Sequence, residues 1–358
     1  MKNCGLSYKK VLRNSSKWLG ALTCLVVLAC SSEQTGKVSK EAGNFFLRGK
    51  TALQRKSYEE AIRLFKEAIN KDSSFAEAWN NWGVAEAALG RQEAAIRAYE
   101  GAIRADSNFI DAYYNRSNAF FEIGKMQEAL ADIEKVIPTY KDSAYVYVSR
   151  GIIFARLKQP EKAFSDFTQA IRLDARNTDA YINRGVLLFE QKKYAEALQD
   201  FEQALQLQPD NDYALNNIAS VQIAQGKYAE ALAKLNKAIA KNARQPYYLN
   251  NRAFAYLMTG NLDAAREDLQ LSLYYDPANS WAVRNAGILA LKEHKLDSAL
   301  SVLQKAFQMN PDTDEIHYYL GLAHFALGNK KAACQEWQQA IAKGERQTIP
   351  EMATACRQ

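Results

Sequence analysis

The chain has 358 residues, of which 48% are hydrophobic and 24% charged, and its formal net charge is +6. Five lysines or arginines and no acid lie in the segment from Met1 to Ala29, so the basic and acidic residues of the remaining chain nearly balance. Proteins that bind nucleic acids electrostatically carry a basic face and a domain pI above about 9. The near-neutral balance excludes that class.

The segment from Met1 to Cys30 has the layout of a secretory signal. A positively charged stretch ends at Lys17, and an apolar run covers residues 19–29. This run is too short for a helix that spans a bilayer, which needs about 20 residues. The run closes on Val27-Leu28-Ala29-Cys30, which resembles the lipobox of bacterial lipoproteins.

This resemblance implies that residues 1–29 are a lipoprotein signal peptide and that acyl chains such as palmitate are attached to Cys30. A plain cleaved signal or an uncleaved anchor is the alternative. Residues 30–41 then form the lipidated cysteine and a flexible polar tether. Ser31 follows the cysteine in place of aspartate, and in families that obey this sorting rule it directs the protein to the outer membrane. The predicted location is therefore exported and lipid-anchored to a bacterial membrane, the outer one by that rule, with the leaflet left open.

An internal repeat fills the rest of the chain. When units are counted as residues 42–75, 76–109 and so on, position 8 is always small and position 24 always large and apolar, as in Gly185 and Phe201. Position 20 is alanine in every unit: Ala61, Ala95, Ala129, Ala163, Ala197, Ala231, Ala265, Ala299 and Ala333. Within a unit, positions 4, 8 and 11 and positions 20, 24 and 27 each lie on one helical face. The period therefore predicts two helices per unit.

Turn residues support this interpretation. Glycine at position 15 allows a left-handed turn between the two helices at Gly90, Gly124, Gly226, Gly260 and Gly328. Proline at position 32 ends the second helix at Pro209, Pro277 and Pro311.

The pattern resembles the tetratricopeptide repeat over residues 42–347, in nine units without an insertion. The resemblance implies an all-α, right-handed superhelical solenoid of nine helix-turn-helix units, with helix A of each unit on the concave side. Residues 348–358 would form a short C-terminal cap that begins a tenth helix A. In an oxidising compartment, Cys334 and Cys356 are expected to form a disulfide that holds this cap, the alternative being two unrelated thiols.

The motifs of the common hydrolases, nucleotide-binding loops and zinc proteases are absent. His317 and His324 share a helical face, but they are separated by about 10.5 Å along the axis and cannot ligate one zinc ion. We therefore predict no catalytic site, metal, cofactor or small-molecule substrate, and a protein that is not an enzyme.

Charged residues recur at positions 7 and 23. Four units have arginine at the first of these positions and aspartate at the second, which predicts a structural salt bridge between helices A and B of one unit. The pairs are Arg116 with Asp132, Arg150 with Asp166, Arg184 with Asp200, and Arg252 with Asp268.

Asparagine recurs at position 6, which resembles the asparagine ladder of peptide-binding tetratricopeptide superhelices. An amide matches a peptide group through one acceptor and two donors. The alternative is that these amides only pack. The predicted peptide-binding groove contains Asn81, Asn115, Asn183, Asn217, Asn251 and Asn285, together with Tyr114, Tyr213, Tyr247, Trp281, Arg284 and Tyr318 at positions 2 and 5.

These features predict a non-catalytic, lipid-anchored scaffold or adaptor. Its groove would bind peptide segments of cell-envelope proteins and assist the assembly or regulation of an envelope complex. The alternative is a structural spacer or a self-associating envelope protein without a dedicated peptide ligand.

Overall fold

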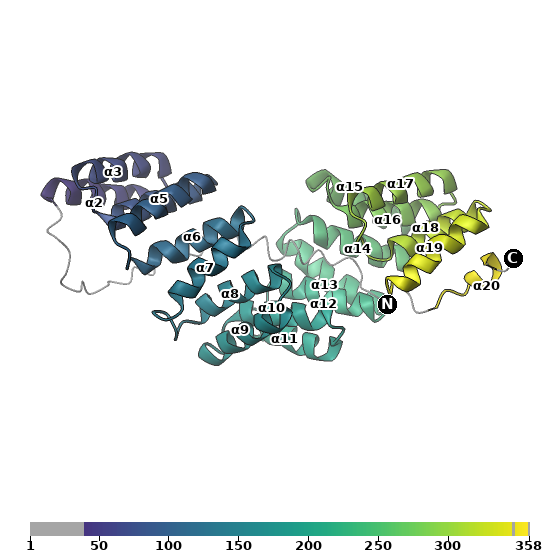
Figure 1. The fold of residues 1–358 in the computed structure, drawn as a ribbon. Helices are drawn as coiled ribbons and strands as arrows, with labels where there is room; N and C mark the ends of the chain where they lie inside the picture. Colours follow the sequence, from purple (N-terminus) through teal and green to yellow (C-terminus); the bar gives the residue numbers. More distant parts are fainter. Residues whose placement is uncertain (1–38, 346–347, 357–358) are drawn as a thin grey trace. The chain divides into compact units, whose positions relative to one another are not determined.

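The computed structural model describes residues 39–345 and 348–356. Within them the chain is all-α: eighteen helices pair as nine helix-turn-helix units, and the short α20 (Met352–Ala355) follows (Figure 1). The first helix of each unit, helix A, is α2 (Lys40–Gln54), α4 (Ala76–Ala88), α6 (Ile110–Glu122), α8 (Ala144–Arg156), α10 (Thr178–Glu190), α12 (Asp212–Ala224), α14 (Pro246–Thr259), α16 (Ser280–Lys292) or α18 (Ile316–Ala326).

The second helix of each unit, helix B, follows after a short turn. The B helices are α3 (Tyr58–Lys71), α5 (Gln92–Ala105), α7 (Met126–Val136), α9 (Pro160–Leu173), α11 (Tyr194–Leu207), α13 (Tyr228–Lys241), α15 (Leu262–Tyr275), α17 (Leu296–Met309) and α19 (Lys330–Ala342). The predicted all-α fold of nine stacked helical hairpins is confirmed.

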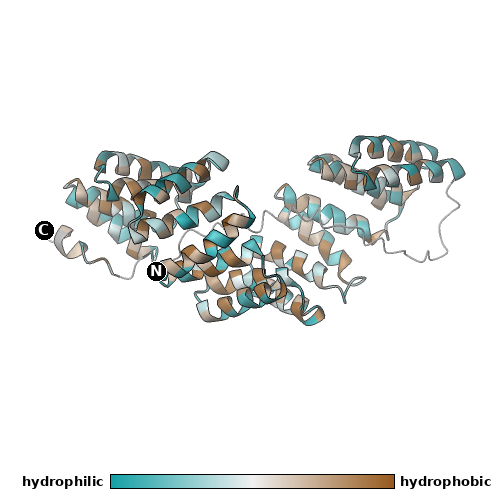
Figure 2. Ribbon diagram, turned by 180° about the vertical axis from the view of Figure 1, so that it is seen from behind, coloured by the Kyte–Doolittle hydropathy of each residue, from teal (hydrophilic) through white to brown (hydrophobic). Residues whose placement is uncertain are grey.

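The chain divides into two compact units. The N-terminal unit contains α2 to α9, the C-terminal unit contains α11 to α20, and the boundary at Tyr181 lies inside α10. In the N-terminal unit, α2 contacts α4 and α4 contacts α6; in the C-terminal unit the contacts run from α12 through α14 and α16 to α18. Each B helix also packs against helix A of the next hairpin, where both helices lie in the same compact unit. Hydrophobic residues, brown in Figure 2, alternate with polar ones around these helices, as expected for faces that meet neighbouring helices.

The close approach of helices A and B depends on positions 8 and 24. A Cβ atom added to Gly185 would lie 2.6 Å from the ring of Phe201, so glycine is what allows this ring to rest on the backbone of α10. Gly49 and Gly151 meet Phe65 and Phe167 in the same way. The contact buries the aromatic ring completely and stabilises each hairpin.

The last hairpin is covered by the chain that follows it. Ile349, Met352 and Ala355 pack on Trp337 of α19, which is fully buried. Cys334 and Cys356 form a disulfide with a Cα–Cα distance of 5.4 Å. Residues 349–356 therefore lie against the last hairpin, and their helix has only four residues instead of the full helix A that the sequence predicts.

None of the helices in the described ranges combines the length and hydropathy needed to cross a membrane.

Candidate peptide-binding surface

The four predicted arginine–aspartate pairs join helices A and B of their units. In each pair the guanidinium donates two hydrogen bonds to the carboxylate at distances of 2.7–2.8 Å. The hydrogen bond to aspartate raises the pKa of Arg116, Arg150, Arg184 and Arg252 above the usual value. Because the aspartates are buried and the arginines mostly so, these pairs act in packing and are not available to a ligand.

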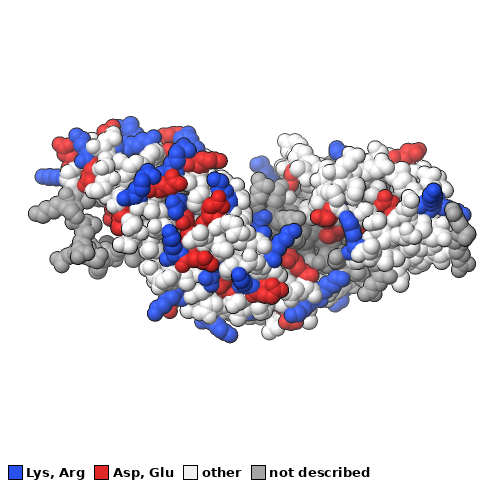
Figure 3. Space-filling model, in the orientation of Figure 1, with Lys and Arg blue, Asp and Glu red and all other residues white. Residues whose placement is uncertain are grey.

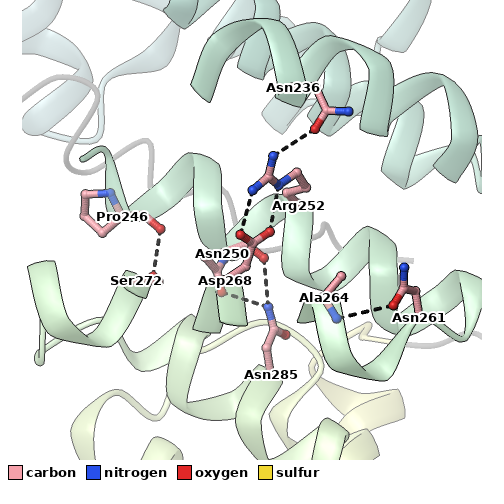
Figure 4. Close-up of polar contacts among 9 residues, drawn as sticks. All are labelled: Asn236, Pro246, Asn250, Arg252, Asn261, Ala264, Asp268, Ser272 and Asn285. Atoms are coloured by element: carbon pink, nitrogen blue, oxygen red, sulfur yellow. Dashed lines mark hydrogen bonds and ion pairs between the residues drawn. The ribbon is translucent and has the colours of Figure 1, made fainter. Parts of the chain in front are cut away.

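Arg252 also connects neighbouring hairpins. Its Nη1 donates to Oδ1 of Asn236 on α13 at 2.8 Å, while Nε and Nη2 bind Asp268 on α15 (Figure 4). Three helices of the C-terminal unit thus meet at one guanidinium.

Several position-6 amides bond along the stack of A helices. The Nδ2 of Asn251 donates to Asn216 Oδ1 at 2.9 Å. The Nδ2 of Asn285 donates to Asn250 Oδ1 at 2.8 Å (Figure 4). Asn250 in turn donates to Asn251 Oδ1 at 3.4 Å. The result is a continuous hydrogen-bonded chain from α12 through α14 to α16.

A buried arginine ends this chain. Arg284 is only 1% exposed, and its Nε and Nη2 donate to Asn285 Oδ1 while its Nη1 donates to the backbone carbonyl of Asp314. Burial raises the pKa of the Asp314 carboxyl to about 7, although the nearby charge of Arg284 opposes this shift. The guanidinium that was predicted to face a ligand is therefore buried and hydrogen-bonded within the C-terminal compact unit.

In the N-terminal unit the same bond occurs once among the described residues. Asn115 donates to Asn80 Oδ1 at 2.9 Å, and Asn81 donates to the backbone carbonyl of Glu77. In the C-terminal unit, Asn183 has an interaction partner, and Asn217 is buried with its Nδ2 unpaired among the described residues. For Asn251 and Asn285 the geometry favours packing over a peptide ladder, because both are buried and their Nδ2 atoms bond to the preceding A helix. Asn115 makes the same kind of bond but is only half-buried.

The sequence contains a signal for this arrangement that position 6 alone does not reveal. The acceptors Asn80, Asn216 and Asn250 occupy position 5, directly before a position-6 asparagine. Recurrent Asn-Asn pairs therefore indicate hydrogen bonds between units.

The predicted aromatic residues differ in accessibility. Tyr247 is buried and donates to Asp276 Oδ2 at 3.0 Å, whereas Tyr114, Tyr213, Trp281 and Tyr318 are half-buried. Tyr145 is 41% exposed on α8 and packs edge to face on Tyr114 of α6, with 5.3 Å between ring centroids. The Tyr114 hydroxyl lies 3.4 Å from the hydroxyl of Ser149. These two rings form an aromatic surface on the A helices that a partner can reach.

The two histidines of α18 are not placed to share a metal ion. His317 is buried, with Nδ1 2.7 Å from Glu336 Oε2 and its ring against Phe307. In the described ranges no three His, Cys, Asp or Glu side chains are grouped to hold a metal ion. The predicted lipidation residue Cys30 lies outside the described residues.

Solved structures with similar folds come from several sources. A tetratricopeptide repeat protein from Parabacteroides merdae is 21% identical with a TM-score of 0.56, covering 69% of this chain and 98% of its own. Pseudomonas aeruginosa PilF is 24% identical with a TM-score of 0.50, covering 59% and 96%. The Cut9–Hcn1 structure of the APC/C is 13% identical with a TM-score of 0.62, covering 98% and 84%. At these identities the likeness shows the fold alone. No curated protein shows significant similarity to the chain.

Family patterns cover nearly all of the helical region. Residues 46–108, 93–144, 216–280 and 284–347 match one Tetratricopeptide repeat pattern, and residues 144–177 and 178–211 match two others of the same description. Together with the nine hairpins and their packing of position 8 on position 24, these matches show that the chain belongs to the tetratricopeptide repeat family.

Proposed function

We propose that the protein is a non-catalytic adaptor that holds an extended segment of a partner protein on the surface of its A helices. Proteins of this repeat family typically serve as scaffolds for protein–protein interaction and are generally not catalysts. The observation that carries the proposal is the pair Tyr114 and Tyr145, because aromatic rings with a polar tip dominate the energetics of protein interfaces.

The partner segment lies against this aromatic surface of α6 and α8. Tyrosine offers apolar area and a hydroxyl at a low cost in side-chain entropy, so it suits a ligand of variable sequence. The amides of Asn115, Asn251 and Asn285, which bond to asparagines of the preceding A helix, hold the helices in place and do not contact the segment. This assignment differs from a ladder of asparagines that grips the peptide.

We place this adaptor in the bacterial envelope, anchored by lipid on Cys30, and its partners among envelope proteins. Support comes from the sequence of residues 1–30, with its basic start, apolar run and lipobox-like end. The test is incorporation of labelled palmitate into the full chain in bacterial cells. Label that is lost in Cys30→Ser and retained in Cys334→Ser supports the anchor, and label absent from the native chain contradicts it.

Site-specific crosslinking tests the partner surface. A photoreactive phenylalanine derivative replaces Tyr145 in one variant and Lys135, on α7, in a control variant. We expect a discrete crosslinked partner from position 145 only. The Tyr114→Ala change should weaken that crosslink. In Asn115→Ala the yield of crosslink per folded molecule should be unchanged. Equal crosslinks from positions 145 and 135 would contradict the proposal and favour a spacer or self-associating protein.

A further inference from the structure

An exposed apolar patch lies at the C-terminal end of α15. Leu271 is 44% exposed, Tyr274 77% and Tyr275 37%, and the two tyrosine rings contact each other with centroids 5.3 Å apart. Met309, at the matching position of α17, is 37% exposed. We call these four residues the α15 patch. Adjacent exposed side chains of this size mark an interaction surface more strongly than scattered ones do.

The repeat provides an internal comparison for this patch. Leu271, Tyr274 and Tyr275 occupy positions 26, 29 and 30 of their unit. In the other eight units, position 26 is polar, charged or glycine: Glu67, Gly101, Lys135, Gln169, Gln203, Lys237, Lys305 and Gln339. Position 29 in those units holds polar or charged residues, alanine or proline. The hairpin packing therefore does not require large apolar side chains at these positions, and α15 is unusual in having them at all three.

The patch has a basic border. Leu235 of α13, Leu269 of α15 and Leu303 of α17 share one core cluster at position 24, so positions 26 and 30 of the three helices share an outer face. Residues 237–244, 271–278 and 305–312 contain four exposed basic residues and one exposed acid, Asp312. The basic residues are Lys237, Lys241, Arg244 and Lys305. Lys241 also contacts the exposed Asp210 at 3.4 Å.

Figure 3 shows how charge is distributed on one face of the molecule. Charges of both signs are interspersed over α2 to α5, whereas the surface over α15 and α17 is largely uncharged.

We propose that the α15 patch docks on the anionic surface of a lipid bilayer. Leucine and methionine enter the acyl boundary, tyrosine rings lie at the headgroups, and the bordering lysines pair with lipid phosphates. A protein partner is less suited, since a stable interface covers about 800 Å² per partner and four partly exposed side chains offer far less. The docking does not depend on a lipid at Cys30.

Vesicle binding tests the proposal with the full chain in a Cys30→Ser background, so that acylation plays no part. The vesicles contain either phosphatidylcholine alone or equimolar phosphatidylcholine and phosphatidylglycerol. The variant is Leu271→Gln with Tyr274→Gln, which introduces polar residues of the kind that other units already have at positions 26 and 29 and should fold, as circular dichroism can verify. Its ratio of bound to free protein on anionic vesicles should fall about tenfold.

Two matched variants separate the contributions. Ile341→Gln removes an isolated exposed apolar residue of α19 and should bind like the parent. Lys237→Gln with Lys241→Gln should weaken binding to anionic vesicles and leave any binding to phosphatidylcholine unchanged. Equal binding of all variants would overturn the proposal.

A depth measurement makes the test independent of other membrane-binding segments. The variant Tyr274→Trp adds a tryptophan to the α15 patch. The difference between its fluorescence and that of the parent protein should be quenched by lipids brominated in their acyl chains. Absence of quenching would overturn the proposal. Concentration-dependent self-association without vesicles, lost in the Leu271→Gln and Tyr274→Gln variant, would assign the patch to a second copy of the chain instead.

Discussion

Position 15 adopts the left-handed backbone conformation in all nine described units. Five of them have glycine there, and the other four have Lys56, Lys158, Lys192 and His294 with φ between 58° and 61°. A side chain in this region clashes with the following carbonyl and costs about 1–2 kcal/mol. The turn geometry is thus imposed by the packing of the hairpin even where the sequence lacks glycine.

Replacing Lys192 with glycine should therefore stabilise the protein. We expect an increase of about 1 kcal/mol in the free energy of unfolding, since relief of strain exceeds the extra entropy of the unfolded chain. Urea denaturation measures the change. The control Lys193→Gly, at the next residue with φ of −81°, should not stabilise; a similar gain from both would contradict the explanation.

The buried carboxylate of Asp200 should be more costly to lose than its whole ion pair. Asp200→Ala removes the carboxylate that accepts two hydrogen bonds from Arg184, and we expect a loss of about 2–3 kcal/mol, reduced from the fully buried case because the arginine side chain is 20% exposed. Arg184→Leu with Asp200→Leu should lose less. Thermal melting compares the two variants, and equal shifts would show that the charge pairing is unimportant.

The Asp314 carboxyl should make stability depend on pH. Burial raises its pKa from 3.8 to about 7, so the folded state binds this proton more tightly than the unfolded state. Its contribution to stability is present below about pH 4 and is lost as the pH rises to about 7. Asp314→Asn should match the native protein near the acidic end and exceed it by about 1–3 kcal/mol above neutrality.

Melting curves across this range check the sign. Asp312→Asn, a change at an exposed neighbour, is the control variant for the loss of one carboxylate. A constant difference between native and Asp314→Asn would mean that this carboxyl has no raised pKa.

Within each hairpin the sizes of positions 8 and 24 are matched. Glycine faces an aromatic ring at Gly49–Phe65, Gly83–Tyr99, Gly151–Phe167, Gly185–Phe201 and Gly321–Trp337. The units with serine or alanine at position 8 have the smaller Ile133, Leu235 or Leu269 at position 24. Gly287 with Leu303 is the intermediate case.

This matching predicts a compensated pair of substitutions. Gly185→Ala should destabilise by about 1–3 kcal/mol, because the new methyl group overlaps the Phe201 ring. Adding Phe201→Leu should restore part of this loss, since it recreates the native Ala219–Leu235 pair. A double-mutant cycle by urea denaturation measures the coupling. Additive losses would contradict the packing argument.

The disulfide joins α19 to the residue that follows α20. Cys334→Ser with Cys356→Ser should expose the cap at residues 348–356 to proteolysis, with a loss of about 3 kcal/mol in the stability of that segment. Reductant should have the same effect on the native protein and none on the variant. Resistance of the reduced native protein would show that Ile349 and Met352 hold the cap by packing alone.

For the molecule as a whole, the repeat period was sufficient to predict all nine hairpins. Small and large residues at fixed positions specify helix pairing locally, so the intra-unit bridges, such as Arg150 with Asp166, also followed from spacing. The contacts between units could not be predicted from this spacing. Whether Asn251 faces a ligand or Asn216 depends on how closely adjacent A helices stack, and the repeat within one unit does not determine that distance.

The α15 patch was missed for a related reason. A search for recurrent spacing finds the residues that the units share, whereas Leu271 and Tyr274 differ from the residues at positions 26 and 29 of the other units. Their exposure on the folded hairpin shows that this difference lies on the surface.

The chain of amides from Asn216 to Arg284 has a mechanical consequence. The bonds from Asn251 to Asn216 and from Asn285 to Asn250 each join one A helix to the preceding one, so a force that spreads α12, α14 and α16 must break them before the hairpins can separate. These two bonds favour one spacing between α12, α14 and α16. A partner that lies across these helices meets a spacing that the two hydrogen bonds favour, and any change in it costs about 1 kcal/mol for each bond broken.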